Sequence, residues 1–319
     1  MTTAAVLGLV AIIGYALVAP IACRRLTPSV ATVLLVVGNV LSAASGVFIL
    51  AVVAFTWIGQ FPLVAQRGAW SPVTLRTDSP VPAWPAAVAG CLVVLAMVSV
   101  AVTGLRQVRA LIAVHRACRG LRPVGELVVL DDDRPDAFST PQPAGRVIVT
   151  SGLLRALAPR ERDVLLAHEK SHLTHHHAWW NLAAGLTAAV NPVLRPAARA
   201  AATSVERWAD EDAARTVGDR RLVATTLVRV AQLQTRFGHP GMVVAATGGD
   251  LETRVRALLA PPPRRRPLVI AAAVAVFAVG ALPAAAVQHT GESLFEHAEA
   301  QQTAQHTAQQ TSQHTTQHA

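Results

Sequence analysis

Four long apolar stretches restrict what this chain can fold into more than any other feature of its sequence. They run from 4 to 23, 31 to 58, 83 to 104 and 267 to 288. A helix rises about 1.5 Å per residue and the hydrocarbon core of a bilayer is about 30 Å thick, so each stretch is long enough to span it. An apolar content of 52% against 15% charged residues agrees. We therefore predict a mainly α-helical membrane protein with four transmembrane helices.

The positions of the arginines indicate how these spans are oriented. They gather at Arg24 and Arg25, over 106–122 and over 264–266. Segments rich in arginine face the cytoplasm under the positive-inside rule, whereas the loop 59–81 carries few and faces outward. We predict a multi-pass protein of the cell membrane with a cytoplasmic segment over 105–266 between spans three and four.

A formal net charge of +9 would also suit a nucleic-acid-binding protein. The basic residues lie where membrane topology requires them, however, so we expect the lipid bilayer and no nucleic acid as a partner. The three cysteines are too dispersed for a disulfide framework. The Gln/His/Thr-rich tail, 289–319, has no apolar periodicity, and we predict that it is disordered and extracytoplasmic.

The cytoplasmic segment contains an H-E-x-x-H motif that begins at His168 and ends at His172. Two histidines four residues apart lie on one face of a helix and form half of a zinc site. Zinc lowers the pKa of a bound water to roughly 7, and Glu169 is placed to take its proton as general base. The motif therefore predicts one Zn²⁺ per chain and hydrolysis of a carbonyl compound.

A catalytic zinc needs a third protein ligand and an open position. A third histidine six residues after His172 is excluded because position 178 is Ala178. The acidic cluster Glu206–Asp212 is the alternative, and Glu206 and Asp210 share one helical face. One of these two can bind zinc while the other accepts the ring N–H of a ligand histidine.

The segment around the motif predicts an α+β fold. Two β-branched runs, 126–130 and 146–150, predict strands, and helices are expected over 197–217, 220–237 and 251–260. An edge strand beside the zinc helix could capture an extended peptide by backbone pairing. A small hairpin that only packs explains the two runs equally well.

The sequence resembles the integral-membrane zinc peptidases of the gluzincin type. The nearest groups are the HtpX/CAAX-protease group and the BlaR/MecR-type sensor-transducer peptidases. The likeness rests on the H-E-x-x-H motif, on an E-x-x-x-D helix at Glu206–Asp210, and on the segments 137–139 and 147–154 before the zinc helix. It covers roughly residues 127–227.

The resemblance implies a zincin-type metallopeptidase in which His168, His172 and Glu206 bind zinc. Glu169 would be the general base, and Asp210 would hold a ligand histidine. The span arrangement resembles that of the BlaR/MecR type, but only the short Gln/His/Thr-rich tail follows the last span in this sequence, so we expect a member without the penicillin-binding sensor domain. The expected function is regulatory cleavage of a protein on the cytoplasmic side, for example of a transcriptional repressor.

Several alternatives stay open from the sequence. The chain could instead be an HtpX-like quality-control protease, or a non-catalytic membrane protein for signalling or metal sensing. The residue that would stabilise the oxyanion is not identified, because the only tyrosine, Tyr15, lies in span one. His175, His176 and Arg207 are candidates for that contact or for substrate binding.

Overall fold

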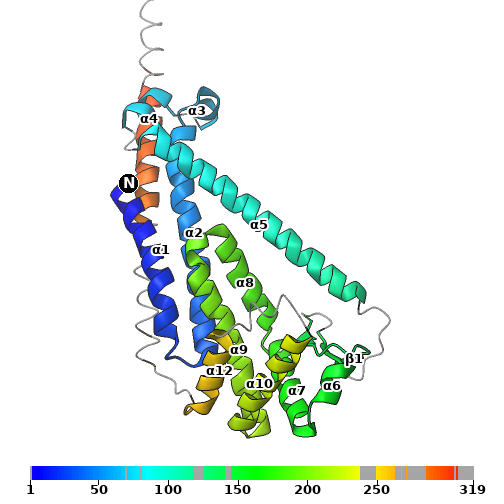
Figure 1. Cartoon of the computed structure of the whole chain (residues 1–319). Coiled ribbons are helices and arrows are strands. Elements are labelled where there is room, and N and C mark those ends of the chain that lie inside the picture. Colours follow the sequence, from blue (N-terminus) through cyan, green and yellow to red (C-terminus); the bar gives the residue numbers. More distant parts are fainter. Residues whose placement is uncertain are drawn as a thin grey trace, which may run out of the picture.

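The computed structural model describes residues 2–68, 70–78, 81–117, 126–140, 145–237, 249–262 and 285–304, and the single positions 267, 271 and 307. Three helices of this part are long and apolar enough to cross a membrane (Figure 1): α1 (Thr2–Cys23), α2 (Pro28–Ile58) and α5 (Ala83–Ala117). They contain the first three predicted spans. The predicted fourth span, 267–288, lies mostly outside the described residues.

Helix α5 continues well past the predicted end of span three. The arginine-rich residues that follow position 104 continue the same helix, which ends at Ala117. Many of the large apolar side chains of α5 are exposed, and Leu95 and Met97 are 60% and 66% exposed. Apolar surface of this extent is stable when lipid, not water, surrounds it.

A helical hairpin lies alongside α2 and packs against the long helices (Figure 1). It consists of α8 (His177–Val190), the 3₁₀ turn η1 (Pro192–Leu194) and α9 (Arg195–Val217). Leu194, Ala197 and Ala201 form one buried cluster with Leu34 and Leu35 of α2. Small alanine side chains let these backbones approach closely. The first half of α9 is therefore held against a membrane-type helix.

A three-stranded sheet precedes the hairpin in the chain. Strand β3 (Val147–Thr150) is central and pairs parallel with β1 (Leu127–Leu130) and antiparallel with β2 (Ala137–Ser139). The simple hairpin considered from the sequence is therefore wrong, because β2 lies between β1 and β3 in the chain and pairs on the other side of β3. All four residues of β3 are buried, since the strand has neighbours on both edges.

Four shorter helices complete this end of the molecule: α6 (Ser151–Ala156), α7 (Pro159–Thr174), α10 (Arg220–Arg236) and α12 (Gly249–Leu259). One side of α7 packs on the sheet, with Leu165 and Leu173 in a cluster with Val149. Its other side places Val164 in a second cluster with α9, α10 and α12. Helix α7 is therefore the central element to which the sheet and the other helices attach.

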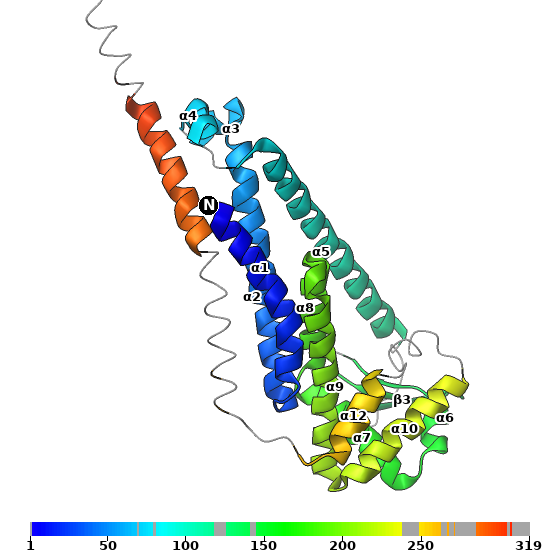
Figure 2. The same ribbon diagram turned by 60° about the vertical axis from the view of Figure 1, so that its left-hand side comes forward.

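The opposite end of the molecule carries α3 (Pro62–Gly68), α4 (Pro72–Asp78) and a helix over 285–304 (Figure 2). The ring of Phe295 lies 5.1 Å from that of Phe55 and 5.0 Å from that of Trp70. The Ser71 N–H also donates to the carbonyl of Ala298. The disorder predicted from residue 289 is therefore wrong over 289–304, because an apolar ring and backbone contacts hold this helix. Residues 308–319 of the predicted tail lie outside the described residues.

Candidate metal centre

Helix α7 carries the H-E-x-x-H motif and has a well-defined start. Pro159 occupies its first turn, and the carboxylate of Glu161 accepts a hydrogen bond from the backbone N–H of Ala158 at 2.8 Å. The helix continues without interruption to Thr174. His168 and His172 therefore lie one turn apart on the same face, with their Nε2 atoms 3.1 Å from each other.

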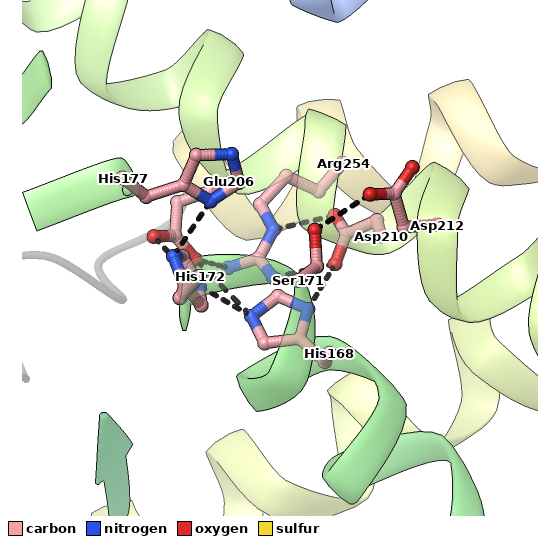
Figure 3. A network of polar contacts seen from close by, with 8 residues as sticks. All are labelled: His168, Ser171, His172, His177, Glu206, Asp210, Asp212 and Arg254. Carbon is pink, nitrogen blue, oxygen red and sulfur yellow. Dashed lines mark hydrogen bonds and ion pairs between the residues drawn. The ribbon is translucent and has the colours of Figure 1, made fainter. Parts of the chain in front are cut away.

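Helix α9 brings Glu206 to these two nitrogens (Figure 3). The Glu206 carboxylate lies 3.6 Å from the Nε2 of His168 and 3.7 Å from that of His172. The three side chains offer one ligand atom each, and these atoms lie within 4.8 Å of one another. Ligands about 2.0 to 2.1 Å from a tetrahedral ion are about 3.3 Å apart, so the spacing fits one metal ion. Two imidazoles and one carboxylate are a set that suits zinc.

A carboxylate from the next turn of α9 holds the other nitrogen of His168. Its Nδ1 lies 3.1 Å from Asp210, which is 2% exposed at the side chain. Burial alone would lower the pKa of His168, but the contacts with Asp210 and Glu206 outweigh it and raise that pKa to about 10. Without a metal, His168 is therefore an imidazolium at neutral pH.

Arg254 of α12 joins both carboxylates of the site. Its guanidinium donates to both oxygens of Asp210, at 2.8 and 2.7 Å, and lies 3.2 Å from Glu206. Burial opposes ionisation of Asp210 and of Glu206, yet Arg254 and His168 together hold the pKa of each carboxyl below its usual range. The positive charges of His168 and Arg254 thus balance the two carboxylates in the metal-free site.

His172 is held at its other nitrogen by a residue of the following helix. The Nδ1 of His172 lies 2.9 Å from the Nδ1 of His177, which is fully buried at the first position of α8. Burial lowers the pKa of His172 to about 4 and that of His177 to about 3, and the neighbouring histidines lower both further. Both rings are therefore neutral at neutral pH.

These protonation states form one series of polar contacts through the site. The imidazolium of His168 forms an ion pair with Asp210 through Nδ1 and donates from Nε2 to the Nε2 of His172. His172 is neutral and donates from Nδ1 to His177. A metal ion bound to both Nε2 atoms would therefore replace the one proton that lies between His168 and His172. The contacts of these two histidines with Asp210 and His177 would stay as they are.

Glu169 lies between the histidine pair and strand β2. It is 8% exposed, and Ser139 of β2 is within hydrogen-bonding reach of its carboxyl. Burial raises the pKa of Glu169 above its usual range, and the charge of His168 and the Ser139 contact oppose that rise. A carboxyl group whose pKa is raised can both take and return a proton near neutral pH.

The three candidates for oxyanion or substrate contact lie at separate places. The Nε2 of His175 lies 2.9 Å from Asp212, and its ring stacks on Trp208 at 4.5 Å. His176 is exposed in the turn between α7 and α8. Arg207 is half-buried, and its Nε has no hydrogen-bond partner among the described residues. Their proposed role stays a prediction.

Sequence reasoning did not assign Arg254 or His177 to the site. Arg254 lies 44 residues after Asp210 on a different helix, and no spacing rule connects the two. If α7 continued past Thr174, its geometry would place residue 177 about 140° away from His172 around the helix axis. The left-handed backbone of His176, with φ of 53°, ends that helix and brings His177 back over His172.

Comparison with known families agrees with this geometry. The model of peptidase family M48 matches residues 105–191, a segment that holds the end of α5, the sheet and helices α6 to α8. The match includes the H-E-x-x-H motif and supports a metallopeptidase of the membrane type. It ends before Glu206, so the third ligand rests on the geometry. No solved structure was found to match the chain.

Proposed function

We propose that this chain is a zinc-dependent endopeptidase of the membrane that cleaves a protein substrate on the cytoplasmic side. The observation that carries the proposal is the convergence of His168, His172 and Glu206 within 4.8 Å. Glu169, which follows His168 directly, is buried between this cluster and strand β2. A structural metal site has no use for a base beside an open coordination position.

The residues of the site would have separate roles in peptide hydrolysis. His168, His172 and Glu206 would hold the metal, which when bound lowers the pKa of water and polarises a carbonyl. Glu169 would take a proton from the attacking water and return it to the leaving amine. Asp210 and Arg254 keep His168 and Glu206 oriented, so little reorganisation is needed during the reaction.

Strand β2 gives the substrate a place to bind. Phe138 lies opposite Ile148 of β3, and hydrogen bonds join the strands at Thr140 and Thr150 on either side. Backbone groups alternate along a strand, so those of Ser139 face the edge of β2 that pairs with no other strand of the described residues. An extended peptide that pairs with this edge would lie beside Glu169, whose carboxyl is in reach of the same Ser139.

Two features support a fourth span and a cytoplasmic site. Helix α12 and the helix over 285–304 lie at opposite ends of the molecule (Figures 1 and 2), as a membrane span between them would require. The sequence there is apolar from residue 268 onward. The arginines near residues 24, 106–122 and 264–266 support a cytoplasmic position for the cluster and an outer position for the helix over 285–304.

A regulatory role on one protein, such as a cytoplasmic repressor, is the finer proposal. A helix whose Phe295 contacts the outer loop segments at one end, and a peptidase site at the other, would suit a transducer. General quality control of membrane proteins is the competing role. The two differ in breadth, because a regulatory enzyme cuts one partner at one position.

The proposal is tested with the full chain purified in detergent and loaded with zinc. The wild type, Glu169→Gln and Lys170→Gln are offered casein, an unfolded membrane protein and a candidate repressor. Lys170 is the matched control, because it is the next residue of the same helix and is exposed. Products are located by mass spectrometry.

We expect the wild type and Lys170→Gln to cut, and Glu169→Gln to lose at least about 100-fold in rate, as for loss of a general base. Cleavage of the repressor at one position favours the regulatory role, and broad cleavage of the unfolded protein favours quality control. Equal cleavage by Glu169→Gln, or none by any zinc-loaded protein, would refute the proposed activity.

A further inference from the structure

We propose that His177 is a positioning residue: it accepts a hydrogen bond from His172 and thereby fixes the tautomer and ring orientation with which His172 faces the metal. The inference rests on the proposed function, since it concerns the same metal centre. His177 lies outside the ligand set and belongs to the next helix, α8.

The geometry at His172 supports this role. Its Nε2 faces the Nε2 of His168 at 3.1 Å and the carboxylate of Glu206 at 3.7 Å. Its Nδ1 lies on the other side of the ring, 2.9 Å from the Nδ1 of His177. The ring of His172 is thus held between the metal cluster and His177, with one nitrogen assigned to each (Figure 3).

Only one arrangement of protons satisfies both contacts. An imidazole that binds a metal through Nε2 carries its proton on Nδ1, so His172 donates to His177. The Nδ1 of His177 must then accept, and its own proton lies on Nε2. A proton on the Nδ1 of His177 would set two N–H groups against each other at 2.9 Å.

The surroundings of His177 lock its ring in this orientation. The ring lies against Trp208, with centroids 5.0 Å apart, and is stacked on His175 at 5.7 Å. His175 is itself fixed by Asp212 at 2.9 Å. The left-handed conformation of His176 sets the direction in which α8 leaves the turn. Rotation of His177 would therefore require movement of several packed groups.

The Nε2 of His177 indicates which contact sets the orientation of the His177 ring. The Nε2 is buried and has no hydrogen-bond partner among the described residues. A buried donor without an acceptor is unfavourable, so a side chain that only filled this space would be better apolar. The contact with His172 is the polar interaction that gives a histidine an advantage at this position.

A neutral partner also suits the charge of the centre. Asp210 and Glu206 already place two carboxylates at the centre, and Arg254 pairs with both. A carboxylate at position 177 would add a third buried negative charge, whereas an imidazole orients His172 without one. The two ligand histidines are therefore held by different means, His168 by a carboxylate and His172 by a ring.

The test compares zinc affinity in the full-length protein in detergent, by competition with a chelator. The variants are His177→Asn, whose side-chain oxygen can replace the accepting nitrogen, and His177→Leu, which keeps bulk without an acceptor. Asn181→Ala is the control, because Asn181 is exposed one turn further along α8. The visible spectrum of Co²⁺-loaded protein reports the ligand geometry in each.

We expect His177→Leu to bind zinc about 10- to 100-fold more weakly and to change the Co²⁺ spectrum. The His177→Asn variant should stay within about threefold of the wild type, as should Asn181→Ala. Wild-type affinity and spectrum in His177→Leu would overturn the inference. Equal loss in the Asn and Leu variants would overturn it too, because shape and not the acceptor would then matter.

A second measurement needs no variant, in case the substitutions prevent folding. Nitrogen-15 NMR of histidine-labelled, zinc-loaded wild type should show His172 protonated at Nδ1 and His177 at Nε2. A proton on the Nδ1 of His177 would refute the inference while zinc binding and the proposed function stand. A wild type that binds no zinc would refute the proposed function itself, and this inference with it.

Discussion

Replacement of Arg254 tests the electrostatic design of the site. The guanidinium makes two hydrogen bonds to Asp210 and an ion pair with Glu206, and its side chain is 14% exposed. The change Arg254→Met keeps most of the length and apolar volume of the side chain. It removes the charge and leaves both carboxylates with His168 as the positively charged side chain in contact with them.

The expected cost follows from burial. Asp210 is 2% exposed at the side chain, so its carboxylate cannot recover water when Arg254 is lost. Removing one partner of a buried pair costs about 3 to 5 kcal/mol. Arg256, two residues further along α12, provides the contrast, since it pairs with Glu252 where the side chains are 77% and 65% exposed. An exposed pair contributes at most about 1 kcal/mol.

The assay is denaturant unfolding of the metal-free protein in detergent, followed by tryptophan fluorescence. We expect Arg254→Met to be destabilised by about 3 to 5 kcal/mol and Arg256→Met to change by less than about 1 kcal/mol. Adding Asp210→Asn to Arg254→Met should cost less than the sum of the single changes, because the unpaired charge is then removed. Equal effects of the Arg254 and Arg256 changes would refute this reasoning.

Three further predictions concern the packing at Gly152, the proton of His168 and the membrane topology. A side chain at Gly152 would clash with the backbone of Asp133, so Gly152→Ala should destabilise the protein by about 1 to 3 kcal/mol. At Gly185 an added Cβ would meet nothing within 4 Å, so Gly185→Ala should not destabilise it, and thermal unfolding compares the two variants. Zinc binding at pH 7 to 8 should release the proton of His168, whose pKa is raised to about 10, so the zinc affinity should rise with pH. Calorimetry in buffers of different ionisation enthalpy counts the released protons, and binding without proton release would contradict this prediction. Cysteines at positions 73 and 297, both exposed, should react with an impermeant reagent from outside in a background without native cysteines. The two positions lie at the same end of the molecule, where the Ser71 N–H donates to the Ala298 carbonyl, so labelling of one alone would contradict this.

Local rules were sufficient for the parts of the site that lie on single helices. A spacing of four residues predicts that His168 and His172 share a face, and the structure brings their nitrogens together. The same rule relates Glu206 to Asp210, and one contacts the histidine pair while the other holds His168. Apolar length alone identified the three long helices that the structure describes.

Tertiary packing determines what the sequence rules missed. Arg254 reaches Asp210 because α12 packs on α9, and neither helix carries a local signal of the other. His177 reaches His172 because one residue, His176, leaves the helical region of backbone space. The helix over 285–304 is stabilised by aromatic contacts with residues more than 200 positions earlier, which polar composition cannot reveal. Strand β2 is only three residues long, too short for periodicity to identify.

X-ray absorption at the zinc edge tests the central claim most directly. It is applied to the full chain, to Glu206→Gln and to a chain that ends at residue 304, with zinc content measured in each. We predict about one zinc per chain with two imidazole nitrogens at about 2.0 to 2.1 Å and oxygen ligands besides. This shell should stay unchanged without the tail, and Glu206→Gln should bind zinc more weakly. A sulfur ligand, a shell that depends on the tail histidines, or a Glu206→Gln protein that binds zinc as the wild type does would contradict the account.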